Sequence, residues 1–329
     1  MSTSEKILLD VKDLKVHFTI PSGGLFRKSG ILKAVDGVSF QVRAGETLGI
    51  VGESGCGKST LGRAVLRLLQ PTGGQVAWLG QEMGEMQPGE LRNVRSDLQV
   101  IFQDPLASLD PRMTIGQIIS EPLVTHNPDL SKNEVKDKVK AMMAKVGLLP
   151  DQINRYPHEF SGGQCQRIGI ARAMILEPKL IVCDEAVSAL DVSIQAQIVN
   201  LLMGLQKEFG LSLIFISHNL SVVRHISQRI MVLYLGRMME VADREQIYTN
   251  PLHPYTKALI SAVPIPDPNI ERNKEHVPLK GDLPSPLNPP SGCVFRTRCP
   301  FAKDICASDV PELKIYEGKR EAACHFIEG

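Results

Sequence analysis

A glycine-rich run near the start of the chain has the residue types needed to hold a phosphate. Gly52-Glu-Ser-Gly-Cys-Gly-Lys-Ser59 matches the pattern G-x-x-x-x-G-K-[ST]. Glycines let backbone N–H groups turn inward, and a following helix directs its positive end at the phosphates. Lys58 would supply charge to the β and γ phosphates, while Ser59 would help to hold Mg²⁺. The predicted nucleotide-binding residues of this run are Gly52, Glu53, Ser54, Gly55, Cys56, Gly57, Lys58, Ser59 and Thr60.

Two carboxylates follow an apolar run further along the chain. Leu180-Ile-Val-Cys183 has the composition of a buried strand, and Asp184 and Glu185 come directly after it. Asp184 could bind Mg²⁺ directly or through water, opposite Ser59. Glu185 would then polarise a water near the γ-phosphate. Taken alone the pair could be an ordinary acidic turn, but together with a phosphate loop it favours hydrolysis of a nucleoside triphosphate.

Short apolar runs alternate with helical patterns around these residues, and they must position them. The runs are too short for helices and indicate buried strands of a parallel sheet. They are residues 47–51, 98–102, 179–183 and 212–216, and the helical patterns are residues 60–69, 112–150 and 194–209. The alternation predicts an α/β fold with a mostly parallel core. Beyond residue 264 prolines are too dense for regular elements, so the predicted domains are 1–264 and 265–329.

Composition limits the class of protein. The 329 residues are 43% hydrophobic and 22% charged, as in ordinary folded domains. A formal charge of +1 gives no general attraction to nucleic acid, so no nucleic-acid partner is expected. No apolar run approaches the roughly 18 residues that span a bilayer, and the first ten residues carry no secretory signal pattern. We expect a cytoplasmic chain.

A third motif, Phe160-Ser161-Gly162-Gly163-Gln164, could be simply a serine-capped helix start. However, this motif is one of six that follow one another along the chain. In order they are the phosphate loop, Gln103, SGGQ, Asp184-Glu185, Ser188-Ala-Leu-Asp191 and His218. Over residues 7–262 this order resembles the ATP-binding cassette (ABC) family. The resemblance implies a phosphate-loop NTPase fold with a mostly parallel core sheet, an antiparallel β subdomain and a helical subdomain at about 104–170. A Pro/Cys-rich C-terminal extension would follow.

The resemblance also implies roles for single residues. Phe18 resembles the aromatic residue that stacks on adenine, and Gln103 the residue linking the γ-phosphate and Mg²⁺ to the helical subdomain. The implied catalytic residues are Glu185, His218 and Gln103, and the implied Mg²⁺ ligands are Ser59, Gln103 and Asp184. Ser161, Gly162, Gly163 and Gln164 would close over the γ-phosphate of ATP held by an opposite subunit. This segment must therefore lie where another protomer can reach it.

Two positions depart from the family pattern. Ala186 follows Glu185 where relatives usually have proline, and Asn219 follows His218 where aspartate is common. We expect modest effects, because every charged catalytic position is present. Among alternatives, a non-transport ABC ATPase would carry long coiled-coil insertions or two cassettes. A GTPase or kinase would lack SGGQ and the histidine, and a metal-sensing regulator would rest on the tail alone.

Three further segments resemble the oligopeptide/dipeptide importer branch, most closely its second type of ATPase subunit. They are Asn250-Pro-Leu-His-Pro-Tyr-Thr-Lys-Ala-Leu259, Gly281-Asp-Leu-Pro-Ser-Pro286 and the run from Pro289 to Pro300. The branch implies a second homologous ATPase subunit, two transmembrane permease subunits and a periplasmic peptide-binding protein. It places the chain peripherally on the cytoplasmic face of the bacterial inner membrane. Relatives also import dipeptides, nickel or glutathione.

The tail contains four cysteines, Cys293, Cys299, Cys306 and Cys324. A reducing cytosol disfavours disulfides, and the spacing lacks the C-x₂-C pairs of zinc ribbons. Four thiolates, one followed by Pro300, suit an iron–sulfur cluster, and some relatives in the branch look to carry a 4Fe–4S cluster at this place. A zinc site and unligated buried cysteines are the alternatives. Cys56, Cys165 and Cys183 are predicted to be packing residues.

Overall fold

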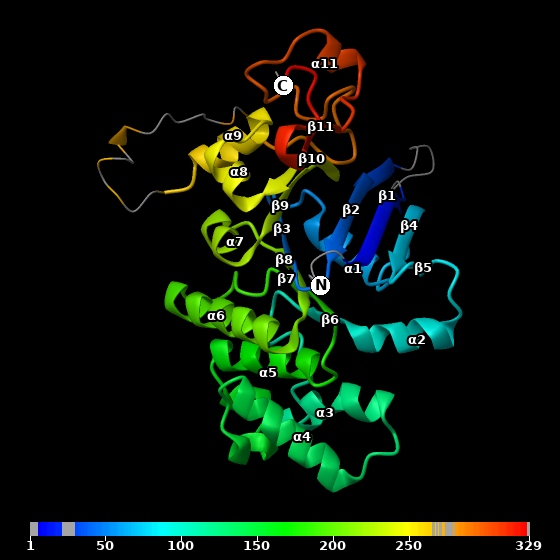
Figure 1. The fold of residues 1–329 in the computed structure, drawn as a ribbon, viewed down its shortest axis with the longest axis vertical. Helices are drawn as coiled ribbons and strands as arrows, with labels where there is room; N and C mark the ends of the chain where they lie inside the picture. The colour runs from blue at the N-terminus through cyan, green and yellow to red at the C-terminus, as the bar shows by residue number, and fades with distance from the viewer. Residues whose placement is uncertain are drawn as a thin grey trace. The chain divides into compact units, whose positions relative to one another are not determined.

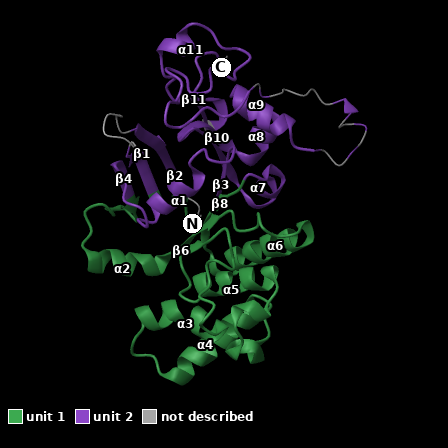
Figure 2. Ribbon diagram, turned by 180° about the vertical axis from the view of Figure 1, so that it is seen from behind, with its two compact units in different colours: residues 1–9, 42–47, 77–217 green, residues 10–41, 48–76, 218–329 purple. Residues whose placement is uncertain are grey.

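The computed structural model describes residues 6–21, 30–264, 267, 269, 272–273, 279 and 281–327. The chain divides into two units, each assembled from segments far apart in the sequence (Figure 2). Unit 1 comprises residues within 1–9, 42–47 and 77–217, and unit 2 comprises residues within 10–41, 48–76 and 218–329. The predicted boundary at residues 264 and 265 touches residues outside the described ranges.

Unit 1 is built on three parallel strands. β6 (Leu98–Ile101), β7 (Leu180–Asp184) and β8 (Ser212–Ile216) pair in that order, and every residue of β7 and β8 is buried. Branched apolar residues make such continuous runs suitable for a strand covered on both faces. The predicted strand at 212–216 therefore matches the observed one, and the parallel core predicted from the sequence is confirmed.

The helices of unit 1 begin at polar caps. Its α-helices are α2 (Pro88–Asp97), α3 (Ile115–His126), α4 (Lys132–Lys145), α5 (Gly162–Met174) and α6 (Val192–Phe209), with 3₁₀ turns at Pro150–Asn154 and Pro157–Glu159. The cap side chains are those of Thr114, Ser131 and Ser161. Each accepts a hydrogen bond from the backbone N–H of the residue three positions later. α3 packs against α4 and α5, and α5 packs against β6 (Figure 1).

Unit 2 contains a sheet with both parallel and antiparallel pairing. β3 (Thr47–Val51) runs parallel to β9 (Arg229–Tyr234), and β10 (Arg237–Asp243) returns antiparallel to β9. The tail continues this sheet, because β12 (Arg320–Ala322) pairs with β10 and β11 (Lys314–Tyr316) pairs with β12. These two short strands follow the proline-rich part of the tail.

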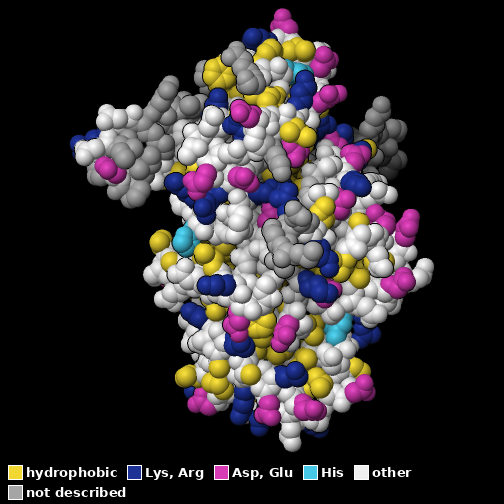
Figure 3. All heavy atoms as spheres, in the orientation of Figure 1, with side chains coloured by type: hydrophobic (Ala, Val, Ile, Leu, Met, Phe, Trp, Pro, Cys, Tyr) yellow, Lys and Arg dark blue, Asp and Glu magenta, His cyan; other side chains and the backbone are white. Residues whose placement is uncertain are grey.

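A further sheet and several helices complete the described elements. A four-stranded sheet has the order β2-β1-β4-β5, from β1 (Ile7–Ile20), β2 (Gly30–Arg43), β4 (Gly73–Trp78) and β5 (Gln81–Glu82). The helices of unit 2 include α1 (Lys58–Val65), α7 (Leu220–Ile226), α8 (Arg244–Thr249), α9 (Pro254–Ser261) and α11 (Ile305–Ser308), with a 3₁₀ turn at Glu317–Lys319. Acidic and basic side chains are interspersed on the face in Figure 3, in keeping with the small formal charge.

Candidate nucleotide site

The phosphate loop follows β3 directly, as the sequence predicts. Gly52 and Gly57 have φ angles of 154° and 103°. A Cβ atom at Gly52 would lie 2.2 Å from the carbonyl oxygen of Leu233, and one at Gly57 would lie 2.0 Å from that of Ala34. Because both obstacles are backbone atoms that cannot swing aside, only glycine fits at these two positions. The tight packing fixes the path of the loop.

The Lys58 side chain binds backbone carbonyl groups of the same loop. Its side chain is only 4% exposed, and Nζ donates hydrogen bonds to the carbonyl oxygens of Gly52 and Glu53, each at 2.9 Å. α1 begins at this lysine, with Gly57 as an N-cap that offers no side-chain oxygen. A helix start without a side-chain cap and beside a lysine is a favourable place for an anion. The loop glycines, Lys58 and the start of α1 thus lie together in unit 2.

The two carboxylates lie in unit 1, where β7 ends. Asp184 is buried at the end of the strand, while Glu185 is partly exposed. The Gln103 side-chain amide donates to Glu185 Oε2 at 3.1 Å, so the structure brings these two predicted residues together. Glu185 has a φ of 49°, a left-handed conformation unusual for a residue other than glycine. Its N–H donates to the Ile216 carbonyl at 3.0 Å, which holds the conformation.

The SGGQ segment also lies in unit 1. Ser161 caps α5 and forms a reciprocal pair with Gln164, at 3.4 Å and 2.9 Å. Ser161, Gly162 and Gln164 are exposed, so another protomer can reach them. A Cβ atom at Gly163 would lie 2.7 Å from the side chain of Ile194, which explains the glycine by close packing within unit 1. The expected accessibility of this segment is confirmed.

Phe18 and His218 belong to unit 2. Phe18 lies on β1 and is 38% exposed. His218 is exposed and lies two residues before the start of α7. Asn219 caps α7, since its side chain accepts from the N–H groups of Ser221 and Val222. Asparagine caps a helix about as well as aspartate, which accounts for the departure at this position.

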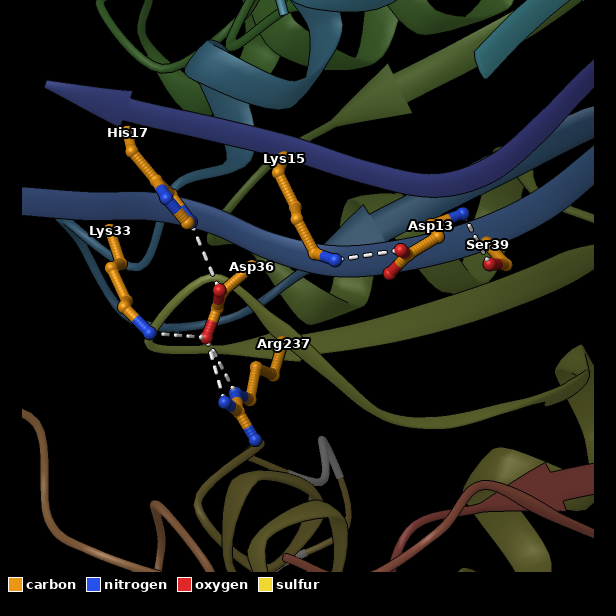
Figure 4. Close-up of polar contacts among 7 residues, drawn as sticks. All are labelled: Asp13, Lys15, His17, Lys33, Asp36, Ser39 and Arg237. Atoms are coloured by element: carbon orange, nitrogen blue, oxygen red, sulfur yellow. Dashed lines mark hydrogen bonds and ion pairs between the residues drawn. The ribbon is translucent and has the colours of Figure 1, made fainter. Parts of the chain in front are cut away.

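A partly buried group of charged side chains that the sequence analysis missed links β1, β2 and β10 (Figure 4). Asp36 Oδ2 accepts from Arg237 at 2.7 Å and 3.1 Å, and Lys33 lies 3.5 Å away. Asp36 Oδ1 lies 3.0 Å from His17 Nε2, next to Phe18 in the chain. Burial alone would raise the pKa of Asp36, but the hydrogen bonds and charges of Arg237 and Lys33 lower it. The sequence analysis could not find this group, because Asp36 and Arg237 lie 201 positions apart in the chain.

The four tail cysteines line one cavity of unit 2, of about 210 Å³, together with His253 and Phe295. Burial and the neighbouring cysteines raise the pKa of the Cys293 thiol to about 11. Within the described ranges, no three His, Cys, Asp or Glu side chains are arranged to hold a metal ion. This arrangement therefore does not support the metal site expected from the four cysteines, whether iron–sulfur or zinc, although all four side chains line the same cavity.

The other three cysteines are packing residues in their geometry. Cys56 is 1% exposed, and Cys165 and Cys183 are fully buried. Burial raises the pKa of each thiol, for Cys183 to about 12. A protonated, enclosed thiol is unreactive.

Comparisons with known proteins agree with this geometry. The "ABC transporter" family model matches residues 35–188, and the model "Oligopeptide/dipeptide transporter, C-terminal region" matches residues 239–306. The oligopeptide transport ATP-binding protein OppF of Salmonella typhimurium is 66% identical over 94% of this chain and 93% of its own length. OppF of Escherichia coli is 64% identical, covering 95% of each chain. The di/tripeptide transport ATP-binding protein DppF of Pseudomonas aeruginosa is 50% identical, covering 98% of each.

Solved structures give the same result for the fold. The cbiO1 subunit from Clostridium perfringens superimposes with a TM-score of 0.64 at 25% identity, covering 75% of this chain and 92% of that one. The cassette MJ0796, solved as a dimer bound to ADP and Pi, gives a TM-score of 0.64 at 26% identity, covering 72% and 99%.

The fold and the ordered motifs thus define an ABC-type ATPase. The chain belongs to the ATP-binding proteins of ABC transporters, in the branch that carries the oligopeptide/dipeptide transporter C-terminal region. In the part of the chain that the structure describes, no helix is long and apolar enough to cross a membrane.

Proposed function

We propose that this chain binds and hydrolyses ATP to power the import of oligopeptides through a transporter of the bacterial inner membrane. It would sit on the cytoplasmic face with a second, homologous ATPase subunit and two transmembrane permease subunits. A periplasmic binding protein would supply the peptide. The proposal is supported by relatives named as oligopeptide transport ATP-binding proteins, which match nearly the whole chain.

The site residues carry the chemistry in this proposal. Backbone N–H groups of the phosphate loop and Lys58 would hold the phosphates, and Phe18 would stack on adenine. Ser59, Gln103 and Asp184 would hold Mg²⁺, which neutralises charge on the γ-phosphate. Glu185 would orient and polarise the attacking water, with His218 on the γ-phosphate. The Ser161–Gln164 segment would close over ATP held by the opposite subunit, so that binding draws two subunits together and hydrolysis frees them.

The single observation that carries the hydrolytic role is the contact between Gln103 and Glu185. A partly exposed carboxylate held in a strained backbone conformation, with a side-chain amide 3.1 Å away, is typical of a functional position. A plain acidic turn has no need of such strain.

Uptake of a labelled oligopeptide by intact cells tests the whole proposal. The Lys58→Ala variant should abolish uptake, because the loop loses the charge that binds the phosphates. If cells with that variant still took up the peptide, the role assigned to Lys58 would be disproved. The DppF similarity makes dipeptides the second candidate substrate, and competition by unlabelled dipeptide, nickel or glutathione separates the candidates.

We further propose that residues 1–264 form the nucleotide-binding domain, with a helical subdomain at about 104–170, and that 265–329 form a C-terminal extension. Cys293, Cys299, Cys306 and Cys324 would hold a 4Fe–4S cluster in that extension. The four cysteines line one cavity, and this is the observation that supports a shared metal group. The cluster would supply folding energy to a segment with little apolar core.

A further inference from the structure

Glu53, the second residue of the phosphate loop, has three different partners within unit 2. Its backbone N–H donates to the hydroxyl of Tyr255 at 3.0 Å. Its carbonyl accepts from Lys58 Nζ at 2.9 Å. Its carboxylate pairs with both terminal nitrogens of Arg298, at 2.5 Å and 3.0 Å. One residue therefore links the phosphate-binding lysine to the C-terminal tail, 245 positions away along the chain.

The pair between Arg298 and Glu53 is sheltered from solvent on the arginine side. Arg298 is 7% exposed, and its guanidinium lies over the Tyr234 ring at 5.9 Å. The hydrogen bonds with Glu53 raise the pKa of Arg298 further above its ordinary value. A forked, partly buried pair of this kind is stronger and more directional than a surface ion pair.

The cysteine segment holds Arg298 at this place. The Arg298 N–H donates to the Phe295 carbonyl at 3.0 Å, in a turn that starts two residues after Cys293. The Phe295 ring packs against Tyr234 and Tyr255, each at 5.3 Å between ring centroids. All three aromatic side chains are almost fully buried. The same cluster thus seats Arg298 and the tyrosine that binds the Glu53 backbone.

A carboxylate in a phosphate loop works against the binding of a triphosphate. Two like charges about 6 Å apart repel by about 3 kcal/mol at an effective dielectric constant of 20. Glu53 is the acidic residue of the loop, and its own carbonyl contacts Lys58. A cation is therefore needed beside this carboxylate, and the tail supplies one.

We propose that Arg298 is a positioning residue of the nucleotide site, which neutralises Glu53 and holds the phosphate loop ready for MgATP. The inference rests on the proposed ATP-binding function and adds that the C-terminal extension completes the site. Arg298 does not touch the phosphates; it acts through Glu53. The tail then takes part in nucleotide binding, in addition to any role in assembly.

Calorimetry of MgATP binding to the purified full-length chain tests this proposal, because the two single variants should change the affinity in opposite directions. Arg298→Gln leaves the Glu53 carboxylate unpaired, so the affinity should fall about tenfold. Glu53→Gln removes the negative charge that opposes the triphosphate, while the glutamine oxygen can still accept from Arg298, so the affinity should rise by about two- to fivefold. The double variant should bind nearer to the wild type than Arg298→Gln does. A merely structural contact would instead weaken binding in all three variants.

Arg296→Gln is the matched control. Arg296 lies in the same segment but donates to Ser291, at 2.9 Å and 3.2 Å, and should leave affinity unchanged. If thermal unfolding shows that Arg298→Gln does not fold, Arg298→Lys is used instead. Lysine loses the forked geometry but keeps the charge that neutralises Glu53, so this variant should bind within about threefold of the wild type.

The inference is overturned if Arg298→Gln binds MgATP with wild-type affinity, or if Glu53→Gln binds it more weakly than the wild type. Where only Arg298→Lys folds, a loss of affinity of tenfold or more in that variant overturns it. Failure of the wild type to bind MgATP, or wild-type binding by Lys58→Ala, would instead defeat the proposed function itself.

Discussion

At the scale of single residues, Glu185 combines a strained backbone with the proposed catalytic role. Glu185 adopts a left-handed conformation that costs a non-glycine residue about 1 kcal/mol or more. The hydrogen bond from its N–H to Ile216 in β8 offsets part of this cost. The neighbouring Ala186 is 1% exposed and packs into the core, so the turn is held without the proline usual at that position.

Glu185→Gln should keep ATP binding and lower the hydrolysis rate by about 10²–10⁴-fold, because the amide cannot accept the proton of water. The similar size of glutamine preserves the contact with Gln103. Phosphate release at saturating MgATP measures the rate, and size-exclusion chromatography with ATP should show a trapped dimer. Turnover at the wild-type rate would remove Glu185 from the catalytic role.

Gly57→Ala should abolish ATP binding and destabilise the chain by about 3 kcal/mol or more, because a Cβ atom would meet the Ala34 carbonyl at 2.0 Å. Gly55→Ala is the matched control in the same loop. Gly55 also has a positive φ, of 78°, but no atom lies within 4 Å of the added carbon. Its cost should be about 1 kcal/mol. Denaturant unfolding compares them, and equal losses would refute the steric argument.

At the scale of elements, the sequence predicts what depends on neighbouring residues. The strands at β3, β7 and β8 and the start of the loop follow from local apolar runs. The helix predicted for 60–69 instead begins at Lys58 and ends at Val65, since Arg67 turns left-handed with a φ of 53°. The pairing of Asp36 with Arg237 spans 201 positions, and no local pattern announces it.

The start of α9 shows the same limit. His253 Nδ1 accepts from the Tyr255 N–H at 3.0 Å, and the Glu240 carboxylate accepts from the N–H groups of Leu252 and His253. Burial raises the pKa of Glu240. The sequence analysis recognised this segment only as a family signature. Its physical role is to hold Tyr255 against the phosphate loop.

His253→Asn should flatten the pH dependence of stability in mildly acidic solution. Burial, with a smaller effect of Lys257, lowers the pKa of His253 to about 3. As pH falls below about 6.5, the unfolded chain therefore takes up a proton that the folded chain refuses, and stability falls by up to about 1.4 kcal/mol per pH unit. Asparagine also caps helices but does not titrate.

The measurement is the free energy of unfolding at several pH values between 5 and 7. His225→Asn, at an exposed position in α7, is the control and should keep the wild-type slope. An unchanged slope in His253→Asn would show that this buried histidine does not govern the acid sensitivity.

At the scale of the whole molecule, the tail is joined to the unit that carries the phosphate loop. β12 pairs with β10, and Arg298 pairs with Glu53. Composition alone marked residues after 264 as a separate extension, and the boundary remains a prediction. What composition could not indicate is that short strands after Pro311 would extend the sheet of unit 2, because three-residue strands form only when an edge is already present.

Cys299→Ser should remove iron from the purified protein if the tail holds a cluster. The four cysteines face one cavity, and replacing one thiolate ligand destabilises the whole cluster. Protein purified without oxygen should contain iron and acid-labile sulfide in equal amounts, and the variant should lose both. Cys165→Ser, a change of a buried cysteine in α5 of unit 1, should keep them. Zinc in place of iron, or unchanged iron in Cys299→Ser, would refute the cluster. Only a cluster makes the content of both iron and sulfide depend on the Cys299 thiolate.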